Sequence, residues 1–87
     1  MYKIVYTKTA AKDVPKLKSA HRADKAKALL DIIRDDPFQK PPPYEKLVGD
    51  LNGAYSRRIN LQHRLVYQVY EEEKTIKILS LWTHYER

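Results

Sequence analysis

The sequence predicts an α+β domain: a small antiparallel sheet of about four strands, with an amino-terminal helical hairpin packed on it, in the order β-α-α-β-β-β. Three observations favour this class. A short β-branched and aromatic segment opens the chain, two stretches with helical spacing of apolar residues follow, and apolar segments separated by turn residues fill the remainder. A chain of 87 residues has room for one small core, so we expect a single domain over residues 1–87.

The first predicted strand is residues 2–7, and the first predicted helix is residues 9–19 with Thr7 or Thr9 as its N-cap. Pro15 removes a backbone hydrogen bond inside this helix, so we expect a kink or a late start there. The apolar positions recur at spacings of three and four and are surrounded by lysines; these are Ala10, Val14 and Leu17 among Lys8, Lys12, Lys16 and Lys18.

A second helix is predicted over residues 24–35, with Ala26, Leu29, Leu30 and Ile33 at i, i+3, i+4 and i+7. Only a few residues link it to the first helix, so we expect an antiparallel hairpin of helices on one face of the sheet. Residues 38–44 contain three consecutive prolines, which indicate a rigid extended connector. This connector delivers Glu45 to a defined place.

The remainder predicts an antiparallel meander with strands over residues 55–60, 64–70 and 75–82. A turn at Asn52-Gly53 precedes it, and residues 71–74 form the loop between the last two strands. Residues 65–69 are apolar almost continuously, which is typical of a central strand buried on both faces.

The composition restricts the class of partner. Seventeen Lys and Arg against eleven Asp and Glu give a net charge of +6, which favours a polyanion, most simply nucleic acid. Residues 1–40 carry 10 basic against 5 acidic side chains, and residues 41–87 carry 7 against 6. The chain has no cysteine, no signal-type apolar segment and no run long enough to span a bilayer, so we expect a cytoplasmic protein with no membrane contact.

Several kinds of site are excluded by residue content. Two glycines cannot build a phosphate-binding loop, and three histidines without cysteine or close carboxylates give no strong metal site. The serines at 19, 56 and 80 lack a neighbourhood suggesting a nucleophile with its base. An enzyme of this sequence would therefore work with acid, base and cation groups, and we expect no metal and no cofactor.

The polar residues that stand out lie in the second half of the chain: Glu45, Arg57, Arg58, His63, Arg64, His84 and Tyr85. A carboxylate, an imidazole and guanidiniums in one groove are the groups needed to cleave RNA through its own 2′-hydroxyl. Arg57 and Arg58 are successive strand residues that face opposite sides, so only one lines the groove. We interpret His63 as structural, and Tyr67 and Trp82 as core aromatics.

Four segments make the sequence recognisable: YEKL at 44–47, DLNGAYSRRI at 50–59, HRLVY at 63–67 and HY at 84–85. Together they resemble the Txe/YoeB family of bacterial toxins in the RelE/ParE superfamily, over about the last half of the chain. This resemblance implies a RelE-like fold and a ribosome-dependent endoribonuclease that cuts messenger RNA in the A site. The partners that it implies are messenger RNA, the ribosome with its RNA and a cognate antitoxin. The oligomeric state stays open, and a homodimer is one of the alternatives.

Residue by residue, the resemblance assigns Glu45 as general base, Arg64 as phosphate-stabilising cation and His84 as general acid. Arg58 matches a supporting cation, and Tyr85 matches a closing tyrosine that orients the substrate. Two departures from the family pattern leave two roles open. Val48 stands where the family has a lysine, with Lys46 as the nearest substitute, so the role of that lysine is not assigned. Glu86-Arg87 follow Tyr85, so the role of a terminal carboxylate directly after the tyrosine is not assigned either. Further RNA contacts are expected from basic residues outside these positions: Lys46, Arg57, Lys8, Lys12, Lys16 and Lys18.

Two other functions fit the same sequence. Some members of the superfamily, in the ParE branch, bind and poison DNA gyrase instead of cleaving RNA. A plain basic RNA-binding module is the third interpretation, and it predicts binding that does not depend on Glu45 or His84. The combination of Glu45, Arg64 and His84-Tyr85 favours the nuclease, because a non-nuclease has no need of all of them together.

Overall fold

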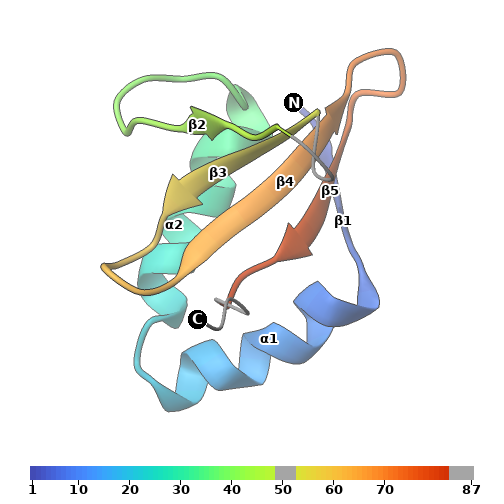
Figure 1. Ribbon diagram of the computed structural model, residues 1–87. Helices are drawn as coiled ribbons and strands as arrows, with labels where there is room; N and C mark the ends of the chain where they lie inside the picture. The colour runs from blue at the N-terminus through green and yellow to red at the C-terminus, as the bar shows by residue number, and fades with distance from the viewer. Residues whose placement is uncertain (49–52, 83–87) are drawn as a thin grey trace.

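The computed structural model describes residues 1–48 and 53–82, which form two helices and one five-stranded sheet (Figure 1). In chain order the elements are β1 (Lys3–Tyr6), α1 (Lys8–Ser19), α2 (Ala23–Asp35), β2 (Glu45–Lys46), β3 (Ala54–Arg58), β4 (Arg64–Tyr70) and β5 (Thr75–Ser80). The α+β class is confirmed, and the predicted strands and helices lie within a few residues of their expected bounds.

The sheet has the order β1-β5-β4-β3-β2 and is mixed. Strands β2 to β5 pair antiparallel, whereas β1 lies parallel to β5, with Lys3 opposite Thr75. The sequence indicated an antiparallel sheet of about four strands; the two differences are the parallel edge strand and the additional β2. At two residues β2 is too short for an apolar pattern to reveal it.

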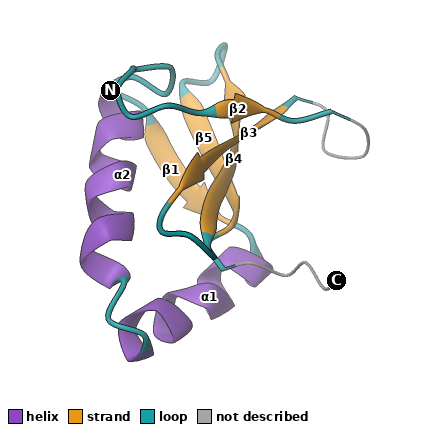
Figure 2. Cartoon of the chain, turned by 60° about the vertical axis from the view of Figure 1, so that its left-hand side comes forward, coloured by secondary structure: helices purple, strands orange, loops and turns teal. Residues whose placement is uncertain are grey.

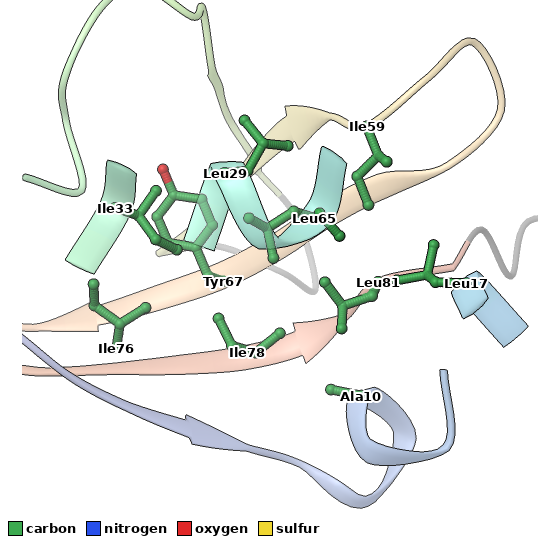
Figure 3. Packing of buried hydrophobic residues seen from close by; sticks show 11 residues of the cluster. Ala10, Leu17, Leu29, Ile33, Ile59, Leu65, Tyr67, Ile76, Ile78 and Leu81 are labelled. Atoms are coloured by element: carbon green, nitrogen blue, oxygen red, sulfur yellow. The ribbon is translucent and has the colours of Figure 1, made fainter. Parts of the chain in front are cut away.

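The central position of β4 follows from its composition. Leu65, Val66 and Tyr67 are all buried, so the continuous apolar segment does lie between covered faces. In Figure 3, Leu29 and Ile33 of α2 pack beside Leu65 and Tyr67 in the main hydrophobic cluster.

Helix α1 runs through Pro15 without interruption and begins at the N-cap Thr7. The Thr7 hydroxyl accepts a hydrogen bond from the Ala10 N–H at 3.1 Å and donates one to the Leu79 carbonyl at 3.0 Å. The expected late start is therefore wrong, because the helix already begins seven residues before Pro15. The cap compensates for part of the cost of the proline by fixing the first turn to β5.

The two helices do not form the expected antiparallel hairpin. Figures 1 and 2 show them meeting at a wide angle, with α2 along the sheet and α1 across its end. Each helix buries a separate apolar stripe, α1 against β5 and α2 over the core face of the sheet. The link between them contains His21 in the left-handed backbone region, at φ 59°, and it turns the chain without reversing it.

A buried carboxylate fixes the chain where it leaves β5. Asp13 of α1 is fully buried, and its Oδ2 accepts hydrogen bonds from the backbone N–H groups of Leu81 at 2.9 Å and Trp82 at 3.2 Å. Lys16 Nζ lies 3.8 Å from the other carboxylate oxygen.

Neither helix in the described part of the chain is both long and apolar enough to cross a membrane.

Candidate functional site

A cleft of about 200 Å³ opens where β2, β3 and β4 lie side by side. Glu45 comes from β2, Ser56 and Arg58 come from β3, and Arg64 comes from β4, with Pro43 and Tyr44 completing the wall. Antiparallel partners that lie directly opposite share one face of a sheet, and the register pairs Glu45 with Ser56 and Arg58 with Arg64. The structure thus brings together three predicted site residues: Glu45, Arg58 and Arg64.

Two like charges dominate the electrostatics of this cleft. Arg58 and Arg64 lie directly opposite each other on neighbouring strands, an arrangement that destabilises a sheet. Glu45 Oε1 lies 3.6 Å from Arg64 Nη1, but the side chains are 69% and 31% exposed, so this ion pair stabilises the fold by at most about 1 kcal/mol. Two arginines and one glutamate leave a net positive charge, which suits a phosphate group.

Arg57 faces the opposite way and is only 1% exposed. Its guanidinium donates four hydrogen bonds: from Nε to the Tyr67 hydroxyl at 3.0 Å, from Nη1 to the Pro42 carbonyl at 2.6 Å, and from Nη2 to the Pro37 and Gln39 carbonyls at 3.0 and 2.9 Å. These bonds contradict the expectation that Arg57 contacts RNA, because its donors are engaged inside the protein. Of the two successive arginines, Arg58 lines the cleft.

Two tyrosines contact this buried guanidinium, Tyr44 through its ring and Tyr67 through its hydroxyl. The Arg57 Cζ lies 5.0 Å from the centroid of the Tyr44 ring, and Tyr44 makes an edge contact with Tyr55 at 5.6 Å. Burial raises the pKa of Tyr67, although the hydrogen bond from Arg57 opposes the rise. The Tyr67 hydroxyl donates to the Pro37 carbonyl at 2.8 Å. Both ends of the proline loop are thereby held, and the loop leads directly into Glu45.

His63 lies in the core and does not line the cleft. It is buried and stacks on Trp82, with ring centroids 3.8 Å apart. Burial lowers the pKa of His63, and the positive charge of Arg22 lowers it further, whereas Asp13 acts in the other direction. These contacts support the structural interpretation of His63 and the placement of Trp82 against the core.

The remaining predicted residues fall into two groups. His84 and Tyr85 lie outside the described residues. Lys46 follows Glu45 on β2, is exposed, and does not line the cleft; Val48 is exposed as well. The helix lysines are all exposed: Lys8, Lys12, Lys16 and Lys18.

In residues 1–48 and 53–82, no three histidine, aspartate or glutamate side chains are grouped to hold a metal ion.

Ser56 is a cleft residue that the sequence did not point to. It is 2% exposed, and its hydroxyl has no hydrogen-bond partner among the protein atoms described. Its only signal is its place in the SRRI segment, because a serine without a neighbouring base in the sequence carries no signature of a site.

Comparison with known proteins gives consistent results. A family profile described as the YoeB-like toxin of bacterial type II toxin-antitoxin system matches residues 6–85. Toxin YoeB of Synechocystis sp. is 41% identical over 59 residues, which cover 68% of this chain and 66% of that protein. Toxin RelK of Mycobacterium tuberculosis is 44% identical over 48 residues, which cover 55% and 56%. The matched segments thus span two thirds or less of these relatives.

Solved structures extend the similarity over nearly the whole chain. A YoeB/ParE toxin from Agrobacterium tumefaciens superposes with a TM-score of 0.85 at 29% identity, covering 95% of this chain and 99% of the other. A chain of the YoeB-YefM complex from Staphylococcus aureus gives 0.82 at 34% identity, covering 98% and 99%. The YoeB dimer from the same organism gives 0.80 at 34%, covering 97% and 98%.

Removing the donors of Arg57 should destabilise the protein strongly. We expect Arg57→Met to lower the free energy of unfolding by about 2–4 kcal/mol, because the Pro42 and Gln39 carbonyls lose their donor. The Pro37 carbonyl and the Tyr67 hydroxyl keep only the hydrogen bond between them. Urea denaturation measures this loss. The control is Arg58→Met at the exposed neighbouring position, for which we expect a change within about 0.5 kcal/mol. Equal stabilities of the two variants would contradict the role of Arg57.

His63 should make the protein less stable in mild acid. Its pKa is lowered from 6.5 in the folded state, so the unfolded chain binds the proton first as the pH falls. The contribution of neutral His63 to the free energy of unfolding is therefore complete above pH 6.5. It is lost progressively as the pH falls from 6.5 to the lower pKa of the folded state. We expect urea midpoints to fall from pH 7 toward pH 5, and His63→Gln to reduce this slope. A matched His21→Gln change on the exposed link should leave the slope in place; an unchanged slope in His63→Gln would contradict the assignment.

Proposed function

Because the chain belongs to the family of YoeB-like toxins of bacterial type II toxin-antitoxin systems, we propose that it is a ribosome-dependent endoribonuclease that cleaves messenger RNA in the A site. The observation that carries the proposal is the convergence of Glu45, Arg58 and Arg64 on one cleft. A proton acceptor beside two cations is the arrangement that transfer of a phosphoryl group from a 5′-oxygen to a 2′-oxygen requires.

In the proposed reaction, Glu45 removes the proton from the 2′-hydroxyl, and the 2′-oxygen attacks the adjacent phosphorus. Arg64 and Arg58 stabilise the negative charge that accumulates on the phosphate oxygens. The bond to the 5′-oxygen then breaks, and His84 donates a proton to that oxygen. The products are a 2′,3′-cyclic phosphate and a free 5′-hydroxyl; Tyr85 orients the substrate. Each proton transfer contributes about 10²–10⁴-fold.

The dimensions of the cleft support dependence on the ribosome. Sites that enclose a small molecule usually have about 300–1,000 Å³, whereas this cleft has about 200 Å³, enough for a phosphate and part of a ribose. It holds the reacting group but not the flanking nucleotides. In the proposed mechanism the ribosome supplies the missing orientation by holding the codon, so we expect free RNA to be cleaved only weakly.

The partners in the proposal follow from the relatives and from charge. A cognate antitoxin is inferred from the Staphylococcus aureus YoeB-YefM complex, and we expect an acidic segment of it to cover the basic cleft. A homodimer is inferred from the YoeB dimer of the same organism. We place the protein in the cytoplasm, where it meets ribosomes, and assign the reaction to side chains without a metal ion.

Arg64→Ala should abolish most of the cleavage. Loss of one donor to the developing phosphate charge reduces the rate by about 10²–10³-fold. The measurement is primer extension on translating ribosomes with a defined message, together with identification of 2′,3′-cyclic phosphate ends. Arg34→Ala, which removes a partly exposed arginine paired with Asp31 on α2, is the control and should cleave normally.

His84→Ala should also abolish cleavage while the urea midpoint stays unchanged. Near-normal cleavage by Arg64→Ala would reject the mechanism. A wild-type protein that binds ribosomes without cutting would favour the RNA-binding module, and inhibition of DNA gyrase would favour the ParE-type alternative.

The helix lysines should serve ribosome binding and not the chemical step. Lys8→Gln, Lys12→Gln and Lys18→Gln combined should weaken ribosome affinity and reduce its salt dependence, because each phosphate that is no longer neutralised lowers the logarithmic salt slope by about 0.7–0.9. Lys16 is kept because it lies near Asp13. The control is Lys3→Gln with Lys74→Gln, at the other end of the sheet. Equal losses in affinity and in the single-turnover rate would show that this division is wrong.

A further inference from the structure

The Ser56 hydroxyl is a buried polar group in the cleft that the proposed chemistry leaves without a role. Ser56 is 2% exposed, lines the cleft, and offers its Oγ to no protein hydrogen-bond partner in the described residues. A buried hydroxyl without a partner destabilises a fold, and an alanine would fill nearly the same space at less cost. For the fold alone, a hydroxyl is therefore a poor choice at this position.

The register places Ser56 beside the proposed general base. Glu45 and Ser56 are direct partners in the antiparallel pair of β2 and β3, so their side chains project from the same face with Cβ atoms about 4.5–5.5 Å apart. A serine hydroxyl and a glutamate carboxylate at that separation are within reach of a hydrogen bond after rotation of the glutamate side chain. Glu45 is 69% exposed and has room to rotate.

The present partner of Glu45 is a weak one. Arg64 Nη1 lies 3.6 Å from Glu45 Oε1, which is longer than a hydrogen bond. Arg64 is also the cation assigned to the substrate phosphate, and a phosphate competes directly with the carboxylate for it. When the phosphate arrives, the carboxylate loses the group that holds it. Among the described residues, the other charged or titratable side chains that line the cleft around the Glu45 carboxylate are Arg58 and Tyr44. In the proposed reaction Arg58 also binds the phosphate, so it does not hold the carboxylate.

We propose that Ser56 is a positioning residue for Glu45: once substrate phosphate engages Arg64, the Glu45 carboxylate turns to the Ser56 hydroxyl, which donates a hydrogen bond to one carboxylate oxygen. The other oxygen then faces the 2′-hydroxyl of the RNA. Ser56 acts through Glu45 and does not itself react. The inference rests on the proposed ribonuclease function, because it assigns a role within that reaction.

The test is Ser56→Ala in the 87-residue chain, measured by single-turnover cleavage on ribosomes programmed with a defined message. Loss of one hydrogen bond to a charged group should reduce the rate at saturating protein by about 10- to 100-fold, with ribosome affinity unchanged. The urea midpoint should stay the same or rise, because an unpartnered buried hydroxyl has been removed. A loss of activity without a loss of stability separates positioning from a structural role.

Two further measurements sharpen the result. The acidic limb of the pH–rate profile should move toward neutral pH in Ser56→Ala, because a donor to the ionised carboxylate has been removed. Ser56→Thr keeps the hydroxyl in a residue that strands favour, and it should recover most of the rate. Ser19→Ala makes the same chemical change at an exposed position on α1 and should leave rate, stability and pH profile unchanged.

The outcomes distinguish this inference from the proposed function. A wild-type protein that does not cleave ribosome-bound message overturns both. A cleaving wild-type protein with an equally active Ser56→Ala variant overturns only the role of Ser56. Parallel loss of activity and of urea midpoint, with an unmoved pH profile, overturns positioning and leaves Ser56 as a packing residue.

Discussion

The buried guanidinium of Arg57 is the interaction on which the candidate site depends. Burying a cation is costly, and here the cost is offset by neutral oxygens: three carbonyls of the proline loop and the Tyr67 hydroxyl. Those carbonyls belong to Pro37, Gln39 and Pro42, and Glu45 begins β2 shortly afterwards. The chain between the second helix and the sheet has no regular structure of its own, so Arg57 replaces a backbone ladder in fixing where Glu45 enters the cleft.

Adjacent residues of β3 have opposite roles because side chains alternate along a strand. Arg57 faces the core with Tyr55, and Ser56 and Arg58 face the cleft. The same backbone segment therefore anchors the loop that carries Glu45 and supplies a cation and a hydroxyl to the cleft. A shift of one residue in the register with β4 would exchange these faces, so the register is constrained from both sides of the sheet.

Local patterns in the sequence predicted much of this fold. Apolar spacing located both helices and strands β3 to β5, and alternation predicted that only one of two successive arginines lines the groove. Which arginine it is depends on the face that α2 covers, and this is a long-range property. The parallel pairing of β1 with β5 joins residues about seventy positions apart and leaves no local signal. Asp13 was detectable in principle, because it lies on the same helical stripe as Ala10 and Leu17.

The weakness of the ion pair between Glu45 and Arg64 is consistent with the proposed reaction. Arg58 and Arg64 repel each other across the sheet, and the exposed glutamate offsets part of this repulsion in the free protein. A buried, bidentate pair would hold Arg64 too firmly for a phosphate to displace the carboxylate. An exposed pair at 3.6 Å exchanges readily. In the proposed reaction, the arrival of the phosphate would therefore satisfy both arginines and release Glu45 in one step. Under that proposal, Arg64 couples substrate binding to the activation of Glu45.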